Sequence, residues 1–424
     1  MESDAKIRRL DCTSDRISNL PRNVIDLILE GLPIRDAART SILSKTWRDV
    51  WVMHPNLVLD QQFFSQLYSN TFTQPMVVEI KRIISNILLV HNGPILVFKL
   101  DIPPYLNLLP ETDFWIRNIS NNGVRKLELL NRFQLTYKMP SYFFSCLELT
   151  NLSLAKCRLD PPRGFQGFNN LLNVKLVNVE ITADMSFGTQ LKELHLSRCT
   201  GIEHLGCLLN RNNNLSNIKI LDSGDLDWQL FECIEKVQLL TLALKGATHF
   251  RNEIINLDKL VGNMPKIKTL WLDVCVPKSF EPGAAVLTRP ISTLEKLILA
   301  CVDLYDLVHI QSVLCLIRSS PKLRYLFVRL EPKVNGNDDM VFLNSMVLPV
   351  DMILDQLETV EILGIIGSRV EFQFIKILLG STPSLRWIKL KKNITVDDPK
   401  EELRILRDLL LIPRASTSSQ IKWE

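Results

Sequence analysis

The sequence of 424 residues lacks the motifs by which most enzyme families are recognised. It has no G-x-x-x-x-G-K-[ST] loop, no G-x-S-x-G elbow, no H-E-x-x-H pair and no dinucleotide-binding glycine fingerprint. The acidic pairs Asp338-Asp339 and Asp397-Asp398 lie in polar segments beside glycine or proline, as is typical of solvated loops. We therefore expect a protein that is not an enzyme and needs no cofactor.

Long apolar runs and strong charge are also missing. No segment reaches the roughly 18 apolar residues of a membrane span, and no apolar leader follows Met1. The formal charge is only +4, and the basic residues are spread along the chain rather than clustered. Neither a membrane nor a nucleic acid is expected as a partner, and a soluble protein of the cytoplasm, the nucleus or both is expected.

Cysteine is present, but not in a pattern that forms disulfides or ribbon-type zinc sites. Nine cysteines occur at wide, irregular spacings without a C-x-x-C pair. An odd number in such an arrangement argues against a disulfide framework. Reduced thiols in an intracellular protein are the expectation.

The most informative stretch is residues 15–51, where apolar residues recur at helical spacing. Pro21 suits the first position of a helix, and Pro33 ends its apolar stripe. A second helix is expected over residues 35–43, and a third begins at Ser44, a good N-cap residue. About 40 residues bury only a modest core, so part of this apolar surface should be covered by a partner.

This stretch resembles an F-box, the helical module that attaches substrate-recruiting subunits to the Skp-type adaptor of a cullin ubiquitin ligase. The pairs Leu20-Pro21, Ile28-Leu29 and Leu32-Pro33 match, as does Leu43-Ser44-Lys45 followed by Trp47, Arg48 and Trp51. The resemblance implies an F-box over residues 15–55 whose adaptor-binding residues are Leu20, Pro21, Ile25, Ile28, Leu29, Leu32, Pro33, Leu43, Ser44, Trp47 and Trp51. An ordinary three-helix cap on a larger domain is the alternative.

Residues 56–93 are interpreted as a connector. Its first residues, LVLDQQFF, favour a strand-like link, and residues 77–93 have the spacing of an amphipathic helix that ends at Gly93. A strand over residues 94–102 should follow.

The remaining chain repeats the pattern L-x-x-L-x-L with aliphatic residues. Its eleven copies begin at Val124, Leu149, Leu171, Leu191, Leu215, Val237, Ile267, Leu294, Leu323, Leu357 and Leu385. The first five steps are 25, 22, 20, 24 and 22 residues, and later steps lengthen to as much as 34. Such periods are those of leucine-rich repeats. The fold class is therefore expected to be α/β, an irregular leucine-rich-repeat solenoid of parallel sheet plus helices over residues 94–350.

Three later copies share more than this pattern. In each, an apolar helical run is followed by polar residues on either side of a proline, and then by the strand. They begin at Leu257, Val313 and Ile375. Proline restricts the residue before it, so each helix should end there. One helix-turn-strand unit cannot bury both of its apolar faces, whereas stacked copies share a continuous core.

The residues between the aliphatic positions should face outward from the parallel sheet. A concave surface of mixed charge and aromatic groups would suit a protein partner. The residues expected to bind a substrate are Lys175, His195, Lys219, Trp271, Phe327, Trp387 and Lys389. The alternative is a solvated sheet face without a partner.

Residues 351–424 resemble the FBD region that closes many plant F-box repeat proteins. The pattern predicts strand, helix and strand, then a helix over residues 399–411 and a strand over residues 420–423. Leu403, Leu406 and Leu410 should align on one face of that last helix. An end repeat exposes its core unless something covers it, so capping is the expected role, with a binding role left open.

One set of residues could be written as a zinc spacing, namely His195, Cys199, His204 and Cys207. His195 should lie on the outward face of a strand, and Cys199 should fill the buried Asn/Cys position that follows L-x-x-L-x-L. No metal site is therefore expected.

The chain as a whole is similar to plant F-box proteins with leucine-rich repeats and an FBD region. That resemblance implies a substrate-recognition subunit of a Skp-cullin-F-box ubiquitin ligase, in which the repeats hold an unknown protein substrate while other subunits transfer ubiquitin. Alanine at Leu20, Pro21 and Trp47 should then abolish adaptor binding and leave the repeats folded. The alternatives are a leucine-rich-repeat scaffold without a ubiquitination role and a receptor that holds a small molecule beneath its partner.

Overall fold

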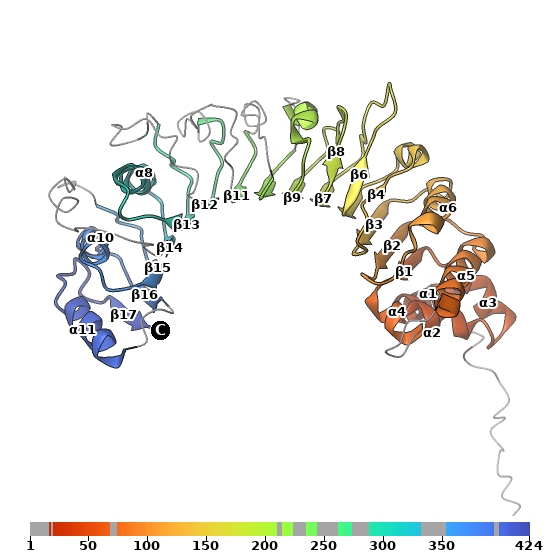
Figure 1. Cartoon of the computed structure of the whole chain (residues 1–424), viewed down its shortest axis with the longest axis horizontal. Helices are drawn as coiled ribbons and strands as arrows, with labels where there is room; N and C mark the ends of the chain where they lie inside the picture. Colours follow the sequence, from red (N-terminus) through yellow and green to blue (C-terminus); the bar gives the residue numbers. More distant parts are fainter. Residues whose placement is uncertain are drawn as a thin grey trace, which may run out of the picture. The chain divides into compact units, whose positions relative to one another are not determined.

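The computed structural model describes residues 17, 20–67, 74–209, 214–223, 235–243, 262–273, 287, 289–331, 353–393 and 398–424, with backbone only at 206–209 and 307–309. The chain divides into two compact units, residues 1–157 and 158–424, called here the first and second units. Both are built from helices and parallel strands (Figure 1).

The first unit opens with the three expected helices, α1 (Arg22–Glu30), α2 (Ile34–Thr40) and α3 (Lys45–Trp51). Ser44 caps α3 as predicted, because its hydroxyl accepts a hydrogen bond from the Trp47 amide. Helix α2 ends three residues earlier than expected. The hydroxyls of Thr40 and Ser41 bond to carbonyls three residues back, and such local bonds compete with helix continuation.

The parallel sheet of the first unit begins inside the segment expected to be a connector. Strand β1 (Asn56–Leu59) pairs in parallel with β2 (Val97–Ile102), and the strand order continues through β3 to β5. The other elements of this unit are α4 (Gln61–Leu67), α5 (Gln74–Val90), α6 (Leu109–Ser120), β3 (Lys126–Asn131), β4 (Tyr137–Lys138), η1 (Ser141–Ser145) and β5 (Asn151–Ala155). Residues 56–93 therefore contribute the first strand of the sheet rather than a separate linker.

The main sheet of the second unit is parallel, with strand order β7-β9-β10-β11-β12-β13-β14-β15-β16-β17. A smaller parallel pairing joins residues 158–159 to residues 180–181. In this unit, Figure 1 shows α8, α10 and α11 on one side of the main sheet. Its elements, with β6 at the boundary, are β6 (Cys157–Leu159), β7 (Asn173–Val177), β8 (Glu180–Ile181), β9 (Glu193–Ser197), η2 (Ile202–Leu209), β10 (Asn217–Leu221), β11 (Leu239–Ala243), β12 (Thr269–Asp273), β13 (Lys296–Val302), α8 (Leu307–Arg318), β14 (Tyr325–Leu330), β15 (Thr359–Ile365), α10 (Arg369–Gly380), β16 (Trp387–Lys392), α11 (Pro399–Leu410) and β17 (Gln420–Trp423). Each of the eleven L-x-x-L-x-L copies carries a strand, which confirms the predicted repeat.

A left-handed residue follows several repeat strands and returns the chain to the core. In the β9 repeat, Arg198 has φ 51° and its amide donates to the carbonyl of Leu221 at 2.8 Å. Cys199 then turns inward and is buried, as expected for the Asn/Cys position. The same left-handed conformation recurs at Lys156, Asn178 and Asp222. The amides of Asn178 and Asp222 likewise donate to the neighbouring strand, so these turns tie one strand to the next.

Helix-turn-strand units occur where the sequence indicated them. Helix α8 ends at Arg318 before Pro321, and α10 ends at Gly380 before Pro383. In the copy that starts at Leu257, residues 257–261 lie outside the described part of the chain.

The C-terminal region confirms the predicted order of elements, and the structure shows which face of α11 is buried. Ile405 and Leu409 are buried, whereas Leu403 and Leu410 are each 69% exposed. The rotation of α11 depends on contacts with the β15–α10 loop. A Cβ on Gly367 would lie 2.4 Å from Ile405, so the loop backbone packs directly on that face.

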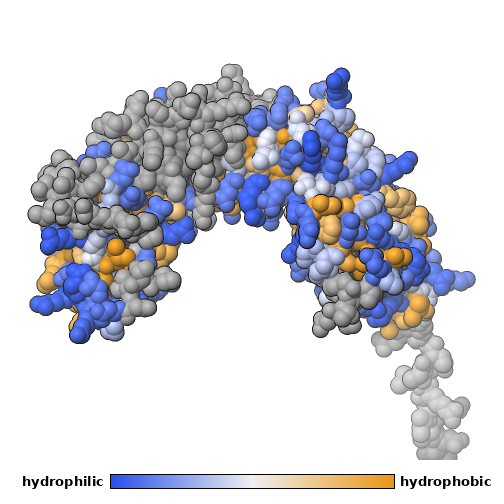
Figure 2. Space-filling view, viewed as in Figure 1, coloured by the Kyte–Doolittle hydropathy of each residue, from blue (hydrophilic) through white to orange (hydrophobic). Residues whose placement is uncertain are grey.

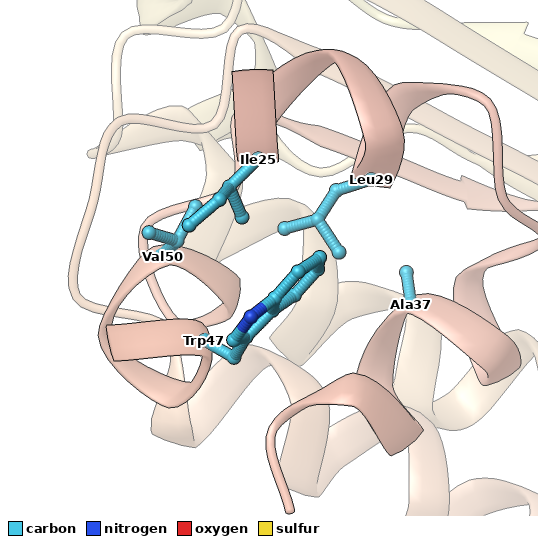
Figure 3. Packing of buried hydrophobic residues seen from close by; sticks show 5 residues of the cluster. All are labelled: Ile25, Leu29, Ala37, Trp47 and Val50. Atoms are coloured by element: carbon cyan, nitrogen blue, oxygen red, sulfur yellow. The ribbon is translucent and has the colours of Figure 1, made fainter. Parts of the chain in front are cut away.

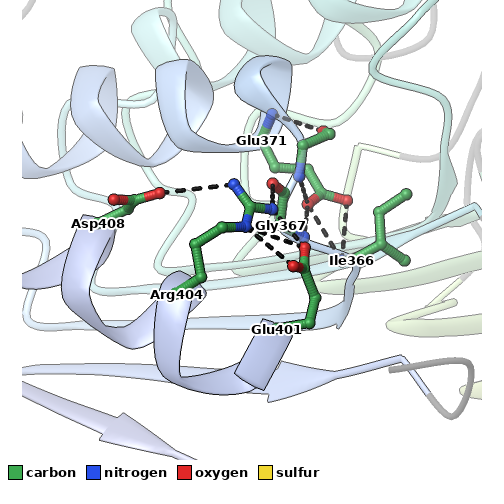
Figure 4. A network of polar contacts seen from close by, with 7 residues as sticks. Ile366, Gly367, Glu371, Glu401, Arg404 and Asp408 are labelled. Atoms are coloured by element: carbon green, nitrogen blue, oxygen red, sulfur yellow. Dashed lines mark hydrogen bonds and ion pairs between the residues drawn. The ribbon is translucent and has the colours of Figure 1, made fainter. Parts of the chain in front are cut away.

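A network of polar contacts holds this loop (Figure 4). The buried carboxylate of Glu371 accepts hydrogen bonds from the amides of Ile366 at 3.1 Å, Gly367 at 2.8 Å and Ser368 at 3.0 Å. Ser368 caps α10 in return, which completes a capping box. On α11, Arg404 donates to the Gly367 carbonyl at 3.1 Å. The last two helices of the chain are thereby joined through one loop, as a cap requires.

Glu371→Ala should loosen this loop. Three amides would lose their acceptor, the buried one of Gly367 and the part-buried ones of Ile366 and Ser368. Leaving a buried donor unpaired costs about 1–3 kcal/mol, and a part-buried donor costs less. Amide hydrogen exchange at residues 366–368 should accelerate at least tenfold. Glu371→Gln keeps one side-chain oxygen acceptor and should accelerate exchange less, so equal exchange in wild type and the alanine variant would contradict the assigned role.

Candidate functional site

The three N-terminal helices pack around Trp47. Its indole meets Ile25 and Leu29 from α1, Ala37 from α2 and Val50 from α3 (Figure 3). Leu20, Leu32 and Trp51 are partly buried and pack against this cluster. The short helices therefore have a core of their own.

This core corrects part of the expected adaptor-binding set. Ile25, Leu29 and Trp47 are 0%, 1% and 2% exposed, so they offer no area to a partner while the module is folded. Their role is to position the helices. Of the remaining residues, Leu20, Leu32, Pro33, Ser44 and Trp51 are half-buried, and Pro21, Ile28 and Leu43 are exposed.

Two strongly exposed apolar residues of the module were not predicted from the sequence. Leu27 on α1 is 67% exposed, and Ile42 in the α2–α3 turn is 82% exposed. A helix turns about 100° per residue, so Leu27 lies about 200° from the buried Ile25, on the opposite side of α1. The sequence signal was that α1 has more apolar residues than one buried stripe needs. Leu27, Ile28, Ile42 and Leu43 are called here the exposed apolar set; Figure 2 shows apolar surface at this end of the chain.

Trp47→Ala should unfold the three helices rather than remove a contact to a partner. Truncating a buried tryptophan typically costs about 3–5 kcal/mol. Trp47→Phe should cost less, because the indole Nε1 makes no hydrogen bond with the described residues. Limited proteolysis should cut residues 20–55 in the alanine variant and spare them in the phenylalanine variant. Equal protection of both variants would contradict the packing.

Two histidines lie where the helical module joins the first strands. His54 follows α3 and is buried, and its ring stacks on Trp51 with centroids 6.3 Å apart. His91 follows α5 and is half-buried. Burial lowers the pKa of His54, partly offset by Glu30 and Asp26, and His91 lowers it further. Burial also lowers the pKa of His91, against hydrogen bonds with the backbone of Pro94 and Gly93.

Acid should weaken this junction. Both pKa values lie below the unfolded value of about 6.5, so the stability contributed by the neutral rings is complete above about pH 7. It is lost as the pH falls through about 6.5, because the unfolded chain then binds protons more readily. Thermal unfolding at pH 7.5 and 5.5 should show a drop that His54→Leu reduces. An undiminished drop in that variant would contradict this assignment.

The outward residues of the second unit form one row across the sheet. The register aligns Lys175 with His195, His195 with Lys219, Lys219 with Thr241 and Thr241 with Trp271. The row continues through Ile298, Phe327, Glu361, Lys389 and Lys422. Trp387 lies on the same face two residues before Lys389.

All seven residues expected to bind a substrate therefore share one face of the sheet. Ile298 was missed, although it occupies the same repeat position as its neighbours. Thr241 shares the row but is buried, so it separates the cationic residues from Trp271 without offering a contact of its own.

Charges on this row are paired at one end and unpaired at the other. Lys389 lies 2.6 Å from Glu361, and the Lys422 ammonium lies 4.0 Å from the Trp387 ring centroid. By contrast, Lys175 and Lys219 have no salt bridge with the described residues, and the buried Nε2 of His195 has no hydrogen-bond partner there. Burial lowers the pKa of His195, and the two lysines lower it further.

The geometry separates the residues with a zinc-like spacing. His204 pairs with Asp184 at 2.8 Å, and the Cys199 thiol donates to the Leu176 carbonyl at 3.4 Å. Burial raises the pKa of Cys199, which favours the protonated thiol over a metal ligand. The side chain of Cys207 and residues 338, 339 and 397 lie outside the described part. Within that part, no group of three His, Cys, Asp or Glu could hold a metal ion, and no helix has the length and apolarity to cross a bilayer.

The fold and the helical module define a leucine-rich-repeat protein with an N-terminal three-helix domain. Comparison with family models identifies that domain: the F-box domain model matches residues 17–59. The model described as "FBD-associated F-box protein At5g56370, LRR repeats" matches residues 112–240.

Curated relatives match nearly the full length of the chain. The F-box/FBD/LRR-repeat protein At1g13570 of Arabidopsis thaliana is 30% identical over 427 residues, which cover 96% of this chain and 98% of the relative. The F-box/FBD/LRR-repeat protein At5g56420 of the same plant is 24% identical over 454 residues, with 97% and 99% covered. The chain belongs to the F-box/FBD/LRR-repeat family.

A solved structure also matches, an internalin from Listeria monocytogenes with 14% identity that covers 72% of this chain and 81% of that one. Its TM-score is 0.31, so the likeness carries no argument, and the fold rests on the strand register described above.

Proposed function

We propose that this chain is the substrate-recognition subunit of a Skp-cullin-F-box ubiquitin ligase. Its F-box would bind a Skp-type adaptor and, through it, a cullin, while the outward face of the repeats would bind a protein substrate. The observation that carries the proposal is the exposed apolar set, Leu27, Ile28, Ile42 and Leu43, on a module whose core is already filled by Trp47.

Exposed apolar residues on a folded module favour a partner surface. Fully burying one leucine or isoleucine side chain is worth about 1.5–3 kcal/mol, although association entropy offsets part of that gain. Single exposed apolar residues are common on any protein. Four of them, on a module that the F-box family model matches, are better explained by docking.

The described cysteines support a role without covalent catalysis. A nucleophilic cysteine needs a lowered pKa. Burial instead raises the pKa of Cys146 to about 12 and raises that of Cys157 as well. These raised pKa values fit a subunit that binds a substrate and has no thiol of its own to carry ubiquitin. Free thiols also suit a reducing compartment, so we propose the cytoplasm or the nucleus as its location.

Adaptor capture tests the proposal directly. The double variant Ile42→Ser, Leu43→Ser removes exposed apolar contacts without touching the core around Trp47. Hot-spot truncations cost more than about 1 kcal/mol each, so the double variant should bind a co-expressed Skp-type adaptor at least tenfold more weakly. Leu403→Ser, Leu410→Ser on α11 is the matched control, because these leucines are comparably exposed but lie outside the F-box. Its adaptor binding should be unchanged.

Three outcomes discriminate between the candidate functions. Loss of adaptor in the F-box variant alone supports the ligase subunit. Capture that persists in both variants contradicts the assigned docking surface. A stable full chain that binds no adaptor even as wild type favours the repeat scaffold without a ubiquitination role.

A further inference from the structure

The cationic end of the outward row has a defined spacing. Lys175, His195 and Lys219 lie on three consecutive parallel strands, β7, β9 and β10, in direct register. Neighbouring strands are about 4.8 Å apart, so the two lysines stand about 9.6 Å apart with His195 between them. One strand, β11, separates Lys219 from Trp271, and the two strand spacings add about another 9.6 Å.

These cations differ from other lysines that face outward from the sheets. Lys99 lies 3.7 Å from Glu128 and Lys389 lies 2.6 Å from Glu361. Lys175 and Lys219 lack such a partner in the described chain. In Figure 2 this stretch of the sheet is hydrophilic. Two lysines in register on either side of His195, neither paired with a carboxylate of the described residues, make a site that an anion would complete.

The acidic groups nearby limit where an anion fits. Glu193 lies two residues before His195 on the same face, but its carboxylate accepts a hydrogen bond from Asn217 at 3.2 Å. Asp273 lies two residues after Trp271, is buried and has an unpartnered Oδ1. Negative charge is therefore favoured over β7 to β10 and disfavoured beside Trp271.

We propose that this row binds an acidic segment of a partner polypeptide, with two carboxylates over Lys175 and Lys219 and an apolar side chain on Trp271. The inference rests on the proposed function in that the partner is the substrate. An extended polyproline-type chain repeats every three residues with a rise of about 9.3 Å, close to the spacing of the row. A Glu-x-x-Glu-x-x-Phe segment running across the strands would therefore match it.

A polypeptide fits better than a nucleic acid. Nucleic-acid affinity depends on many phosphate contacts, and this site offers two lysines and one histidine beside Glu193. The formal charge of the chain is only +4.

The test uses the full chain co-expressed with a Skp-type adaptor. The probe is a fluorescein-labelled peptide with one Glu-x-x-Glu-x-x-Phe pattern in a Gly/Ser background, measured by fluorescence anisotropy. Lys175→Glu, Lys219→Glu should weaken binding at least about tenfold, because like charges then face each other. Lys400→Glu, Lys391→Glu, which changes the net charge equally at two exposed lysines away from β7 to β10, should leave binding unchanged.

Peptide variants separate the two halves of the site. Replacing both glutamates by glutamine should remove the salt dependence of binding together with most of the affinity. Replacing Phe by Ser in the peptide should weaken its binding to the wild-type chain. The same replacement should have little effect on its binding to the Trp271→Ala variant. A peptide whose glutamates are separated by one residue rather than two should bind more weakly.

Several results would overturn the inference: equal binding of the glutamine peptide, unchanged binding by the charge-reversed variant, or a single-stranded DNA of equal length that binds as tightly as the peptide. Adaptor capture is scored on the same samples. Peptide failure with intact capture refutes only the acidic segment, whereas lost capture with intact peptide binding refutes only the ligase proposal.

Discussion

The packing of inward aliphatic residues between consecutive parallel strands is the constraint on which this structure depends. One strand with its connecting segment exposes leucines on the inner face, and only the next repeat covers them. The same ladder sets the register of the outward side chains, since successive residues of a strand point to opposite faces. A repeat that slipped by one residue would place its leucines in water and its charges in the core. The core therefore determines the composition of the binding face.

Ends of such a ladder need other elements, and the two units solve this differently. Strand β1 carries the sheet of the first unit up to the F-box helices, which have their own core around Trp47. In the second unit, α11 and β17 follow the last helix-turn-strand copy, and the Glu371 carboxylate fixes the loop on which α11 packs. The FBD region is thus joined to the sheet by hydrogen bonds as well as by apolar contacts. A stable end leaves the outward face free for a partner.

On the proposed function, recognition and attachment would depend on different interactions. The F-box surface offers apolar area. Burial of that area would drive binding, and it does not depend on the direction of individual contacts. The outward row offers cations and an aromatic ring at fixed intervals, which favours partners with matched charge and spacing. This division suits the proposed subunit, which would attach through the F-box and bind its partner through the repeats.

The positions of the repeat strands and several helix boundaries followed from the sequence alone. The L-x-x-L-x-L pattern located eleven strands because aliphatic residues at period two leave little choice of face, and proline and Ser44 marked helix boundaries by local chemistry. Only the tertiary structure decided which apolar residues of α1 and α11 are buried. A short helix with more than one apolar stripe can bury either stripe, and the elements that pack against it decide which one is buried. In α11 the backbone at Gly367 packs against Ile405 and so favours burial of that face. Charge pairing was likewise decided by the fold. Lys389 meets Glu361, whereas Lys219 meets no carboxylate among the described residues, because strand register joins residues more than twenty positions apart.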